Sequence, residues 1–315
     1  MTVKNFLEVV EIKTKIASLF PFVIGVLFTL SYFKEFQALN TFLFFVGMII
    51  FDMTTTAINN FMDFNKAKSQ EYKYQENVIG RENLSTKLVA GMIGLMLGIT
   101  LIIGLVLAYR TGWLLLFMGA ACCFVGVFYT FGPIPLSRMP LGEVFSGVTM
   151  GLGIFSMVVY INTQAFFLTL DFQHDQFSLT GSIWAVAGIV WAALPLVFTI
   201  ANIMLANNLR DLETDIKNHR YTLVYYIGRK HGVQLFSWLM HACYVVLAMG
   251  VFMGIFSWPV LLVGGTLPKI RQNLKAHRNC LPEPRSFVYS LKNMVLFNSA
   301  YALSLILSII WQQIG

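Results

Sequence analysis

Two polar segments of an otherwise apolar chain share residue types at the same spacing. The first opens NNFMDFNKA and the second opens NNLRDLETD. Each begins with two Asn residues and places an Asp four positions after the first Asn. The second adds Asp215 after another four positions, where the first has Ala67. We call residues 59–71 the first box and residues 207–220 the second box.

The spacing of the boxes predicts a metal site. Residues four positions apart share a helix face, so each box should present its polar groups on one side. Carboxylate and amide oxygens suit Mg²⁺, which is usually held by one or two carboxylates with phosphate oxygens and water. Single Asn or Asp residues at helix ends also act as caps, but two matching boxes favour a shared site. The predicted metal ligands are Asn59, Asp63, Asn207, Asp211 and Asp215, and the three Asp residues are the predicted catalytic groups.

Basic residues accompany both boxes. Arg contacts phosphate through two parallel hydrogen bonds, and Lys acts as a point charge. Acids, amides and cations together favour a diphosphate bridged by Mg²⁺, although basic residues in connections also serve only to orient membrane helices. The predicted diphosphate-binding residues are Asn59, Lys66, Lys73, Arg81, Asn207, Arg210 and Lys217.

The elements that carry the boxes are predicted to be membrane helices. The chain has 315 residues, 57% of them apolar and only 12% charged, whereas soluble domains have about 25% charged residues. Apolar runs of about 20 residues are typical of membrane spans. We therefore expect an all-α, single transmembrane domain over residues 1–315, in two pseudo-repeated halves, with nine helices in one bundle. The predicted spans are 15–33, 41–62, 88–108, 113–131, 141–167, 183–206, 233–254, 256–270 and 289–312.

Charge distribution predicts the orientation. Of the 22 Lys and Arg residues, all except Lys34 and Arg110 fall in or directly beside alternate connections or the N-terminal segment, and cytoplasmic connections carry the positive excess. The N-terminus, both boxes and an active-site cavity should therefore face the cytoplasm, with the C-terminus outside the cell membrane. If residues 233–270 formed one span, the basic segment 269–285 would move outside, which favours nine spans over eight. The net charge of +7 needs no nucleic-acid partner.

At the two boxes the chain resembles the UbiA superfamily of intramembrane prenyltransferases. The superfamily has nine helices, a first motif Asn-Asp-x-x-Asp-x-x-x-Asp and a second motif Asp-x-x-x-Asp. The second motif is intact here as Asp211-Leu-Glu-Thr-Asp215. In the first, Asn60 replaces an Asp and Ala67 replaces the last Asp. The resemblance therefore implies a metal site that has fewer acids on the side of the first box.

Further segments resemble one branch of this superfamily, the 1,4-dihydroxy-2-naphthoate polyprenyltransferases. FYTFGPIPLSRMPLGE, residues 128–143, is similar to that branch's Tyr-Thr-x-Gly-Pro-x-Pro…Gly-Leu-Gly-Asp/Glu stretch, with Pro140 at the first Gly of the second part. The resemblance covers nearly the whole chain. It implies Mg²⁺-dependent transfer from a polyprenyl diphosphate to the naphthoate through an allylic cation, with loss of CO₂ and diphosphate, in menaquinone biosynthesis. The prenyl tail is expected to lie in a groove between spans that opens sideways to the lipid bilayer.

The same stretch supplies the predicted acceptor-binding residues, Tyr129, Arg138 and Glu143. Arg138 could bind the acceptor's carboxylate or a phosphate, or only orient its connection. Residues 71–83 are expected to cap the site, and Glu71 could replace the missing acid in part. Lys15 is expected to be an interfacial anchor, and residues 169–181 an ordinary polar loop.

Other functions share some of these sequence features. Within the superfamily the acceptor could be 4-hydroxybenzoate, homogentisate, haem or a glycerol-phosphate lipid. CDP-alcohol phosphotransferases require a tighter Asp-x-x-Asp-Gly-x-x-Ala-Arg box, which this sequence lacks. A secondary transporter with internal repeats would place its doubled site at the membrane midplane, whereas these boxes fall at span ends.

Overall fold

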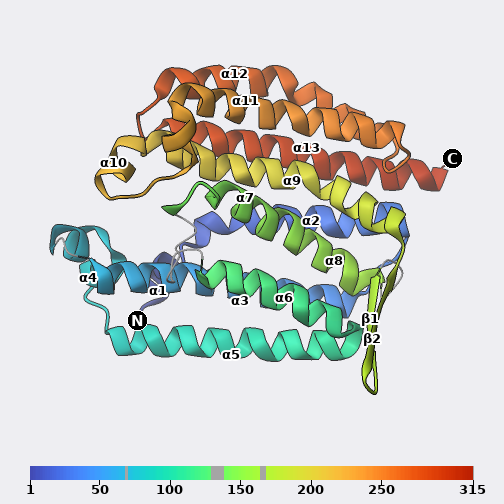
Figure 1. The fold of residues 1–315 in the computed structure, drawn as a ribbon, viewed down its shortest axis with the longest axis horizontal. Helices are drawn as coiled ribbons and strands as arrows, with labels where there is room; N and C mark the ends of the chain where they lie inside the picture. The colour runs from blue at the N-terminus through green and yellow to red at the C-terminus, as the bar shows by residue number, and fades with distance from the viewer. Residues whose placement is uncertain (68–69, 129–137, 164–167, 315) are drawn as a thin grey trace.

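The chain folds as a bundle of long helices that run side by side (Figure 1). The computed structural model describes residues 1–67, 70–128, 138–163 and 168–314. Seven of its helical segments are long and apolar enough to cross a membrane, as expected for a multi-pass membrane protein. They are Ile16–Phe33, Ala38–Asn65, Thr86–Thr111, Gly142–Thr163, Ile183–Arg210, Leu223–Phe252 and Ser286–Ile314.

The helices alternate along the chain with short turns and one pair of strands. The first half comprises α1 (Val3–Val9), η1 (Ile12–Lys15), α2 (Ile16–Phe28), η2 (Thr29–Phe33), α3 (Ala38–Lys66), η3 (Tyr72–Glu76), α4 (Val78–Arg81), α5 (Thr86–Thr111) and α6 (Trp113–Phe128). The remainder comprises α7 (Gly142–Ser146), η5 (Gly147–Gly153), α8 (Ile154–Thr163), β1 (Leu168–Gln173), β2 (Gln176–Gly181), α9 (Ile183–Arg210), α10 (Leu212–Lys217), α11 (Leu223–Phe252), η6 (Trp258–Thr266), α12 (Leu267–Cys280) and α13 (Ser286–Ile314).

Two of the nine predicted spans are not among these seven segments. The described part of the predicted span 113–131 is the 16-residue helix α6. The predicted span 256–270 is the 3-10 helix η6, which leads directly into the more polar α12. The all-α membrane bundle is thus confirmed, while the count of nine spans stays a prediction.

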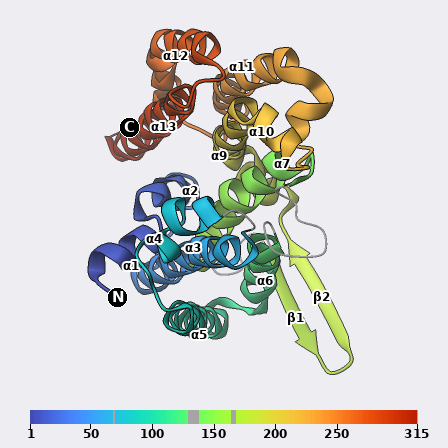
Figure 2. The same ribbon diagram turned by 90° about the vertical axis from the view of Figure 1, so that its left-hand side faces the viewer.

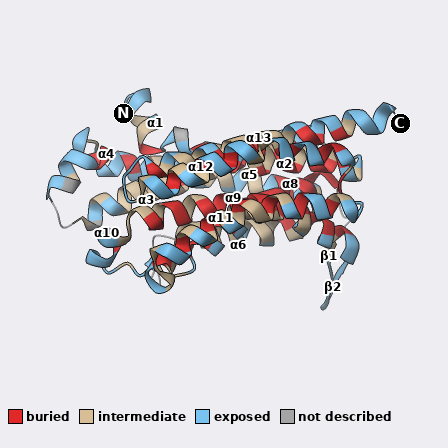
Figure 3. Cartoon of the chain, turned by 90° about the horizontal axis from the view of Figure 1, so that it is seen from above, coloured by how far each residue is buried: buried red, intermediate tan, exposed pale blue. Residues whose placement is uncertain are grey.

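Seen along the helix axes, the helices form two groups (Figure 2). Helices α9, α11, α12 and α13 make one group, and α3, α5 and α6 make the other, with α2 and α7 between them. Buried residues lie on the inner faces of these helices (Figure 3). The outer faces are apolar as well; for example Leu95, Leu101 and Ile102 on α5 are more than 60% exposed, which suits contact with lipid.

Each box-bearing helix end has its own small core. Near the end of α3, Ala57 packs with Val9, Ile79 and Val89 from neighbouring elements. Near the end of α9, Leu205, Ala206 and Leu209 pack with Val224 and Phe236. These two clusters fix the ends of α3 and α9 independently, at the same end of the bundle (Figure 1).

The span that contains α7, η5 and α8 approaches α9 very closely. A Cβ atom added at Gly151 would lie 2.7 Å from the backbone nitrogen of Val197, and one at Gly147 would lie 2.7 Å from its carbonyl oxygen. Such contacts exclude any side chain, so glycine is required at both positions. The π-helical turn η5 and these glycines hold α7 against α9 near the second box.

Residues 168–181 form an antiparallel β-hairpin, so the expectation of an ordinary polar loop was wrong. Leu168, Leu170 and Phe172 alternate with polar residues along β1. Alternation with a period of two is the pattern of a strand that has one apolar face. The hairpin lies at the end of the bundle opposite to the two boxes (Figure 1).

Candidate active site

The two boxes meet at a cavity of about 320 Å³ between the ends of α3 and α9. The cavity combines carboxylates, amides and guanidinium groups at one end of an apolar bundle. Its lining residues are Asn59, Asp63, Arg138, Met204, Asn207, Asn208, Arg210, Asp211, Asp215 and Arg220. All five predicted metal ligands therefore border one cavity.

The second box is interrupted within its helix, which the sequence did not predict. Helix α9 ends at Arg210, and Asp211 has φ −94° and ψ 8° before α10 begins. The hydrogen bonds nevertheless continue in helical order, because the Asp211 amide donates to the Asn207 carbonyl and the Asp215 amide donates to the Asp211 carbonyl, at 2.9 and 2.8 Å. The break redirects the chain, yet all three polar residues still border the cavity.

Ion pairs hold the short helix α10 in place. Arg210 donates two hydrogen bonds to Asp211, at 2.6 and 2.5 Å. On the outer side of α10, Arg229 donates two hydrogen bonds to Glu213, at 2.8 and 2.6 Å. Paired guanidinium–carboxylate contacts of this kind fix orientation as well as distance. The turn of the second box is thus fixed on both its cavity side and its solvent side.

Asp215 is the most buried carboxylate that lines the cavity, at 5% exposure. Burial raises its pKa, and the charge of Asp211 raises it further, while Arg220 opposes the shift. The nearest guanidinium atom, Arg220 Nε, lies 3.6 Å away, which is too long for a hydrogen bond. The same buried Nε has no hydrogen-bond partner among the described residues. Arg220 therefore presents a free donor beside the carboxylates.

The first box contributes fewer groups to the cavity. Asn59 and Asp63 line it, but Asn60 faces the other way and donates to the Val9 carbonyl at 2.9 Å. Ala67 lies one residue past the end of α3, in extended backbone. The two positions where the superfamily motif has further acids are thus outside the cavity lining.

Glu143 does not line the cavity but contacts a residue that does. Asn208 lines the cavity and donates from Nδ2 to Glu143 Oε1 at 2.7 Å, with both residues buried. The other carboxylate oxygen, Oε2, has no hydrogen-bond partner within the described residues. Of the other predicted acceptor residues, Arg138 borders the cavity, and its carbonyl accepts from the Tyr221 amide at 3.1 Å. Tyr129 falls outside the described residues.

The predicted diphosphate ligands are only partly gathered at the cavity. Arg81 pairs with Glu8 and borders a second cavity together with Asn60 and Asn77. Lys73 Nζ lies 4.7 Å from the centroid of the Phe64 ring. Lys217, at the end of α10, and Glu71 are exposed, and Lys66 is the last residue of α3. Lys73 and Arg81 would contact a diphosphate in the cavity only if the segment between α3 and α5 moved towards it.

Three cavity residues were missed by the sequence reading: Met204, Asn208 and Arg220. Asn208 is the second Asn of its box, and Arg220 lies five positions beyond Asp215. The prediction relied on residue types that occur at the same position in both boxes, and Arg220 has no counterpart in the first box. A search for basic residues within two turns of each acid would have included it.

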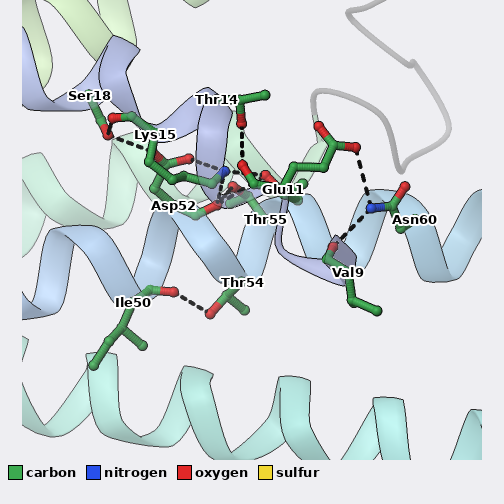
Figure 4. Close-up of polar contacts among 11 residues, drawn as sticks. Val9, Glu11, Thr14, Lys15, Ser18, Ile50, Asp52, Thr54, Thr55 and Asn60 are labelled. Carbon is green, nitrogen blue, oxygen red and sulfur yellow. Dashed lines mark hydrogen bonds and ion pairs between the residues drawn. The ribbon is translucent and has the colours of Figure 1, made fainter. Parts of the chain in front are cut away.

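A buried ion pair was also missed. Lys15 is only 6% exposed and pairs with Asp52, whose second oxygen accepts from Ser18 Oγ at 2.5 Å (Figure 4). The expectation of an interfacial anchor at Lys15 was therefore wrong. The signal was Asp52 itself, a lone acid inside an apolar span, because such groups are costly unless paired.

The ligand groups at the cavity suit Mg²⁺ better than a metal ion whose ligands all come from protein side chains. No cluster of three or more His, Cys, Asp or Glu side chains able to hold a metal ion occurs in the described part of the chain. Mg²⁺ is usually held by one or two carboxylates together with water and phosphate oxygens. Burial and, to a smaller extent, the charge of Asp211 raise the pKa of Asp215, and a divalent cation would favour its charged form.

Comparisons with known proteins identify the family of the chain. Residues 18–291 match the UbiA prenyltransferase family. The chain is 27% identical over 263 residues to 1,4-dihydroxy-2-naphthoate octaprenyltransferase of Bacillus subtilis (strain 168), which covers 83% of this chain and 78% of that protein.

Solved structures share the fold across the whole chain. The apo structure of a UbiA homologue from Aeropyrum pernix K1 has a TM-score of 0.66 at 14% identity, covering 92% of this chain and 98% of that one. A UbiA homologue from Archaeoglobus fulgidus bound to DMAPP and Mg²⁺ has a TM-score of 0.62 at 12% identity, covering 95% and 99%. Because the family match spans most of the chain and the architecture agrees throughout, the protein is a membrane prenyltransferase of the UbiA family.

Proposed function

We propose that the protein transfers a polyprenyl group from a polyprenyl diphosphate to 1,4-dihydroxy-2-naphthoate, with Mg²⁺ as cofactor. The observation that carries the proposal is the single cavity that brings both boxes together with three arginines at one end of an apolar bundle. The naphthoate activity of the Bacillus subtilis relative supports the choice of acceptor. DMAPP and Mg²⁺ in the Archaeoglobus fulgidus homologue support the choice of donor and metal.

The arginines at the cavity would bind the diphosphate as it leaves. Arg138, Arg210 and Arg220 border the cavity, and the buried Nε of Arg220 is without a hydrogen-bond partner among the described residues. When the allylic carbon–oxygen bond breaks, diphosphate keeps the electron pair and its negative charge grows. Donors that are already fixed near this charge stabilise the transition state more than the ground state.

The carboxylates and amides of the boxes would hold Mg²⁺ against the diphosphate. The residues that would do so are Asn59, Asp63, Asn207, Asp211 and Asp215. The ion would supply positive charge to the phosphate oxygens. The ion pairs of α10 keep Asp211 and Asp215 at the cavity, so the chain's own contribution is to place these oxygens beforehand.

The acceptor would lie beside the diphosphate, near Asn208 and Arg138. We propose that Arg138 binds the naphthoate carboxylate and that Glu143 orients Asn208 through their 2.7 Å hydrogen bond. The electron-rich ring forms the new carbon–carbon bond to the allylic cation, and CO₂ and diphosphate are released. Apolar walls of the bundle would keep water from the cation.

We also propose that the cavity faces the cytoplasm across the cell membrane. Lys34 and Arg110, the two basic residues outside the positive segments, both lie at the opposite end of the bundle, where Arg110 donates to Asn40 at 2.7 Å. The positive excess on the cavity side is the signature of a cytoplasmic face. The chain would act as one domain of two pseudo-repeated halves, each of which contains one box.

A competition assay tests the proposal. Purified protein in lipid nanodiscs receives one prenyl diphosphate, Mg²⁺ and equal amounts of 1,4-dihydroxy-2-naphthoate, 4-hydroxybenzoate, homogentisate and haem. We expect prenylated naphthoate with release of CO₂ and diphosphate, and no product when Mg²⁺ is chelated. Prenylation of another acceptor without the naphthoate would refute the acceptor assignment. In a parallel experiment with sealed proteoliposomes, uptake of a substrate without diphosphate release would support a transporter instead.

A further inference from the structure

The β-hairpin has two faces of opposite character. In its antiparallel register Leu170 pairs with Leu179 and Phe172 pairs with Phe177, so these four side chains share one face. The other face carries Thr169 and Thr180, whose hydroxyl oxygens lie 2.7 Å apart. Because side chains alternate between faces along a strand, the hairpin is amphipathic over its whole length.

The apolar face is left largely uncovered by the rest of the chain. Phe172 is 56% exposed, Phe177 is 73% exposed and Leu179 is 57% exposed. A two-stranded hairpin is marginally stable in water without a partner for its apolar face. Clustered exposed aromatic and aliphatic side chains mark a surface that something else covers.

The hairpin lies across the helices at the end of the bundle opposite the cavity. It runs perpendicular to the helix axes and projects beyond α6, as the two ribbon views agree (Figures 1 and 2). If the helices cross a bilayer, this direction is parallel to the membrane plane. The hairpin would therefore lie along the membrane surface.

Exposed aromatic residues place that end of the bundle at a membrane–water interface. They occupy helix ends at the same end as the hairpin, and Trp and Tyr are enriched at such interfaces. The pair Trp258–Trp311 has ring centroids 5.3 Å apart, where η6 starts and α13 ends. The residues are Tyr109, Trp113, Trp184, Trp258 and Trp311, each at least 49% exposed.

A contact between α6 and β1 shows which way the apolar face points. The rings of Phe117 and Phe172 have centroids 6.5 Å apart. Phe117 lies four residues inside the start of α6 at Trp113, which is about 6 Å deeper along the helix. The face that carries Phe172 is therefore turned towards the membrane interior and the Thr169–Thr180 face towards water.

We propose that residues 168–181 form an interfacial anchor, whose apolar face binds the lipid leaflet at the end of the bundle opposite the active site. Each strand is paired along one edge only, so its outer backbone groups would stay at the level of the headgroups while the apolar side chains enter the lipid. Leu170, Phe172, Phe177 and Leu179 would lie among acyl chains next to the headgroups. The role is independent of the prenyl-transfer chemistry at the cavity.

Site-directed spin labels in proteoliposomes test the proposal. Single cysteines are introduced as Phe177→Cys, Ser178→Cys, Leu179→Cys and Thr180→Cys after replacement of the four native cysteines. Each label is relaxed by oxygen, which concentrates in lipid, and by a water-soluble nickel chelate. We expect oxygen to dominate at positions 177 and 179 and the chelate to dominate at 178 and 180.

Two other outcomes would overturn the anchor. Strong relaxation by the chelate at all four positions would place the hairpin in water. Weak relaxation by both reagents at positions 177 and 179 would mean that protein, such as a second copy of the chain, covers the face.

A second measurement avoids removal of the cysteines. Phe177→Trp and Ser178→Trp are each made in protein that contains fluorinated Trp and is embedded in nanodiscs, so that one new fluorine resonance appears in each variant. Oxygen should broaden the resonance of residue 177, and the nickel chelate should broaden that of residue 178. Equal broadening of the new resonance in both variants would contradict the proposal.

Discussion

The ammonium nitrogen of Lys15 lies 2.9 Å from Oδ1 of Asp52 and 2.5 Å from Oγ1 of Thr56, inside the bundle (Figure 4). Asp52 precedes Asn59 by seven residues and Asp63 by eleven. These separations are close to two and three helical turns, so all three residues lie on one face of α3. The ion pair ties the start of α2 to the face of α3 that carries the first box, and so fixes the rotation of the box towards the cavity.

Breaking this pair should cost stability. Lys15→Met leaves Asp52, whose side chain is only 18% exposed, with no opposite charge, and breaking a largely buried pair in this way typically costs about 3–5 kcal/mol. Replacing both residues, as in Lys15→Met with Asp52→Leu, removes the buried charge altogether and should recover most of the loss. Unfolding of the three proteins in matched detergent micelles measures the difference. Additive losses in the double variant would show that the two residues do not act as a pair.

The sequence predicted those features that have a period or a repeat. The long apolar helices and the matching boxes were visible because residues recur at helical spacing. Lys15 with Asp52 and Glu143 with Asn208 were not predicted as pairs, because each joins residues more than 30 positions apart. Such contacts depend on how helices pack, as the close approach of Gly151 to Val197 shows. The alternation of apolar and polar residues in the hairpin is typical of a strand, but its polar residues and its position between two spans favoured the prediction of a loop.

The two acids of the second box should be required for turnover. Asp211→Asn and Asp215→Asn remove charge at the cavity while keeping side-chain size. Loss of one fixed electrostatic group typically lowers kcat on the order of 10²–10³-fold, and the Mg²⁺ concentration for half-maximal activity should also rise. Diphosphate release from a prenyl diphosphate measures both effects.

Glu213 provides the matched control for these variants. It lies between Asp211 and Asp215 on the same short helix, but is exposed and pairs with Arg229 on the solvent side. Glu213→Gln removes the charge but keeps a side-chain oxygen that can accept from Arg229, so α10 should stay in place and turnover and Mg²⁺ dependence should remain near normal. If all three variants lost activity equally, the effect would come from the folding of α10 rather than from the cavity.

Acid should destabilise the protein through His277. This residue is fully buried, its ring stacks on Phe236 with centroids 4.2 Å apart, and both ring nitrogens lack a hydrogen-bond partner among the described residues. Burial lowers its pKa from 6.5 to about 4. Between these values the unfolded chain binds a proton that the folded chain does not, so stability falls as the pH falls. The loss from neutral pH to pH 5 is about 2 kcal/mol.

Thermal unfolding at several pH values tests this effect. His277→Phe keeps the ring stack and removes the titrating group, so its melting temperature should fall less than that of the wild type between pH 7 and pH 5. His231, which is exposed on α11, provides a control. His231→Gln should keep the wild-type dependence, and equal acid lability in wild type and His277→Phe would remove His277 as the cause.

Arg220 should bind the donor's diphosphate, although the first box has no equivalent residue. Its Nε is buried and unpartnered among the described residues, and hydrogen bonds to charged groups contribute about 1.5–3 kcal/mol. Arg220→Gln should therefore raise the KM for prenyl diphosphate, and the Ki for inorganic diphosphate, by about 10–100-fold. The KM for the acceptor should change little. Arg229→Gln, which removes a guanidinium from the solvent side of the same turn, is the matched control. A similar rise of the KM for prenyl diphosphate in both variants would mean that net charge attracts the donor, rather than a direct contact from Arg220.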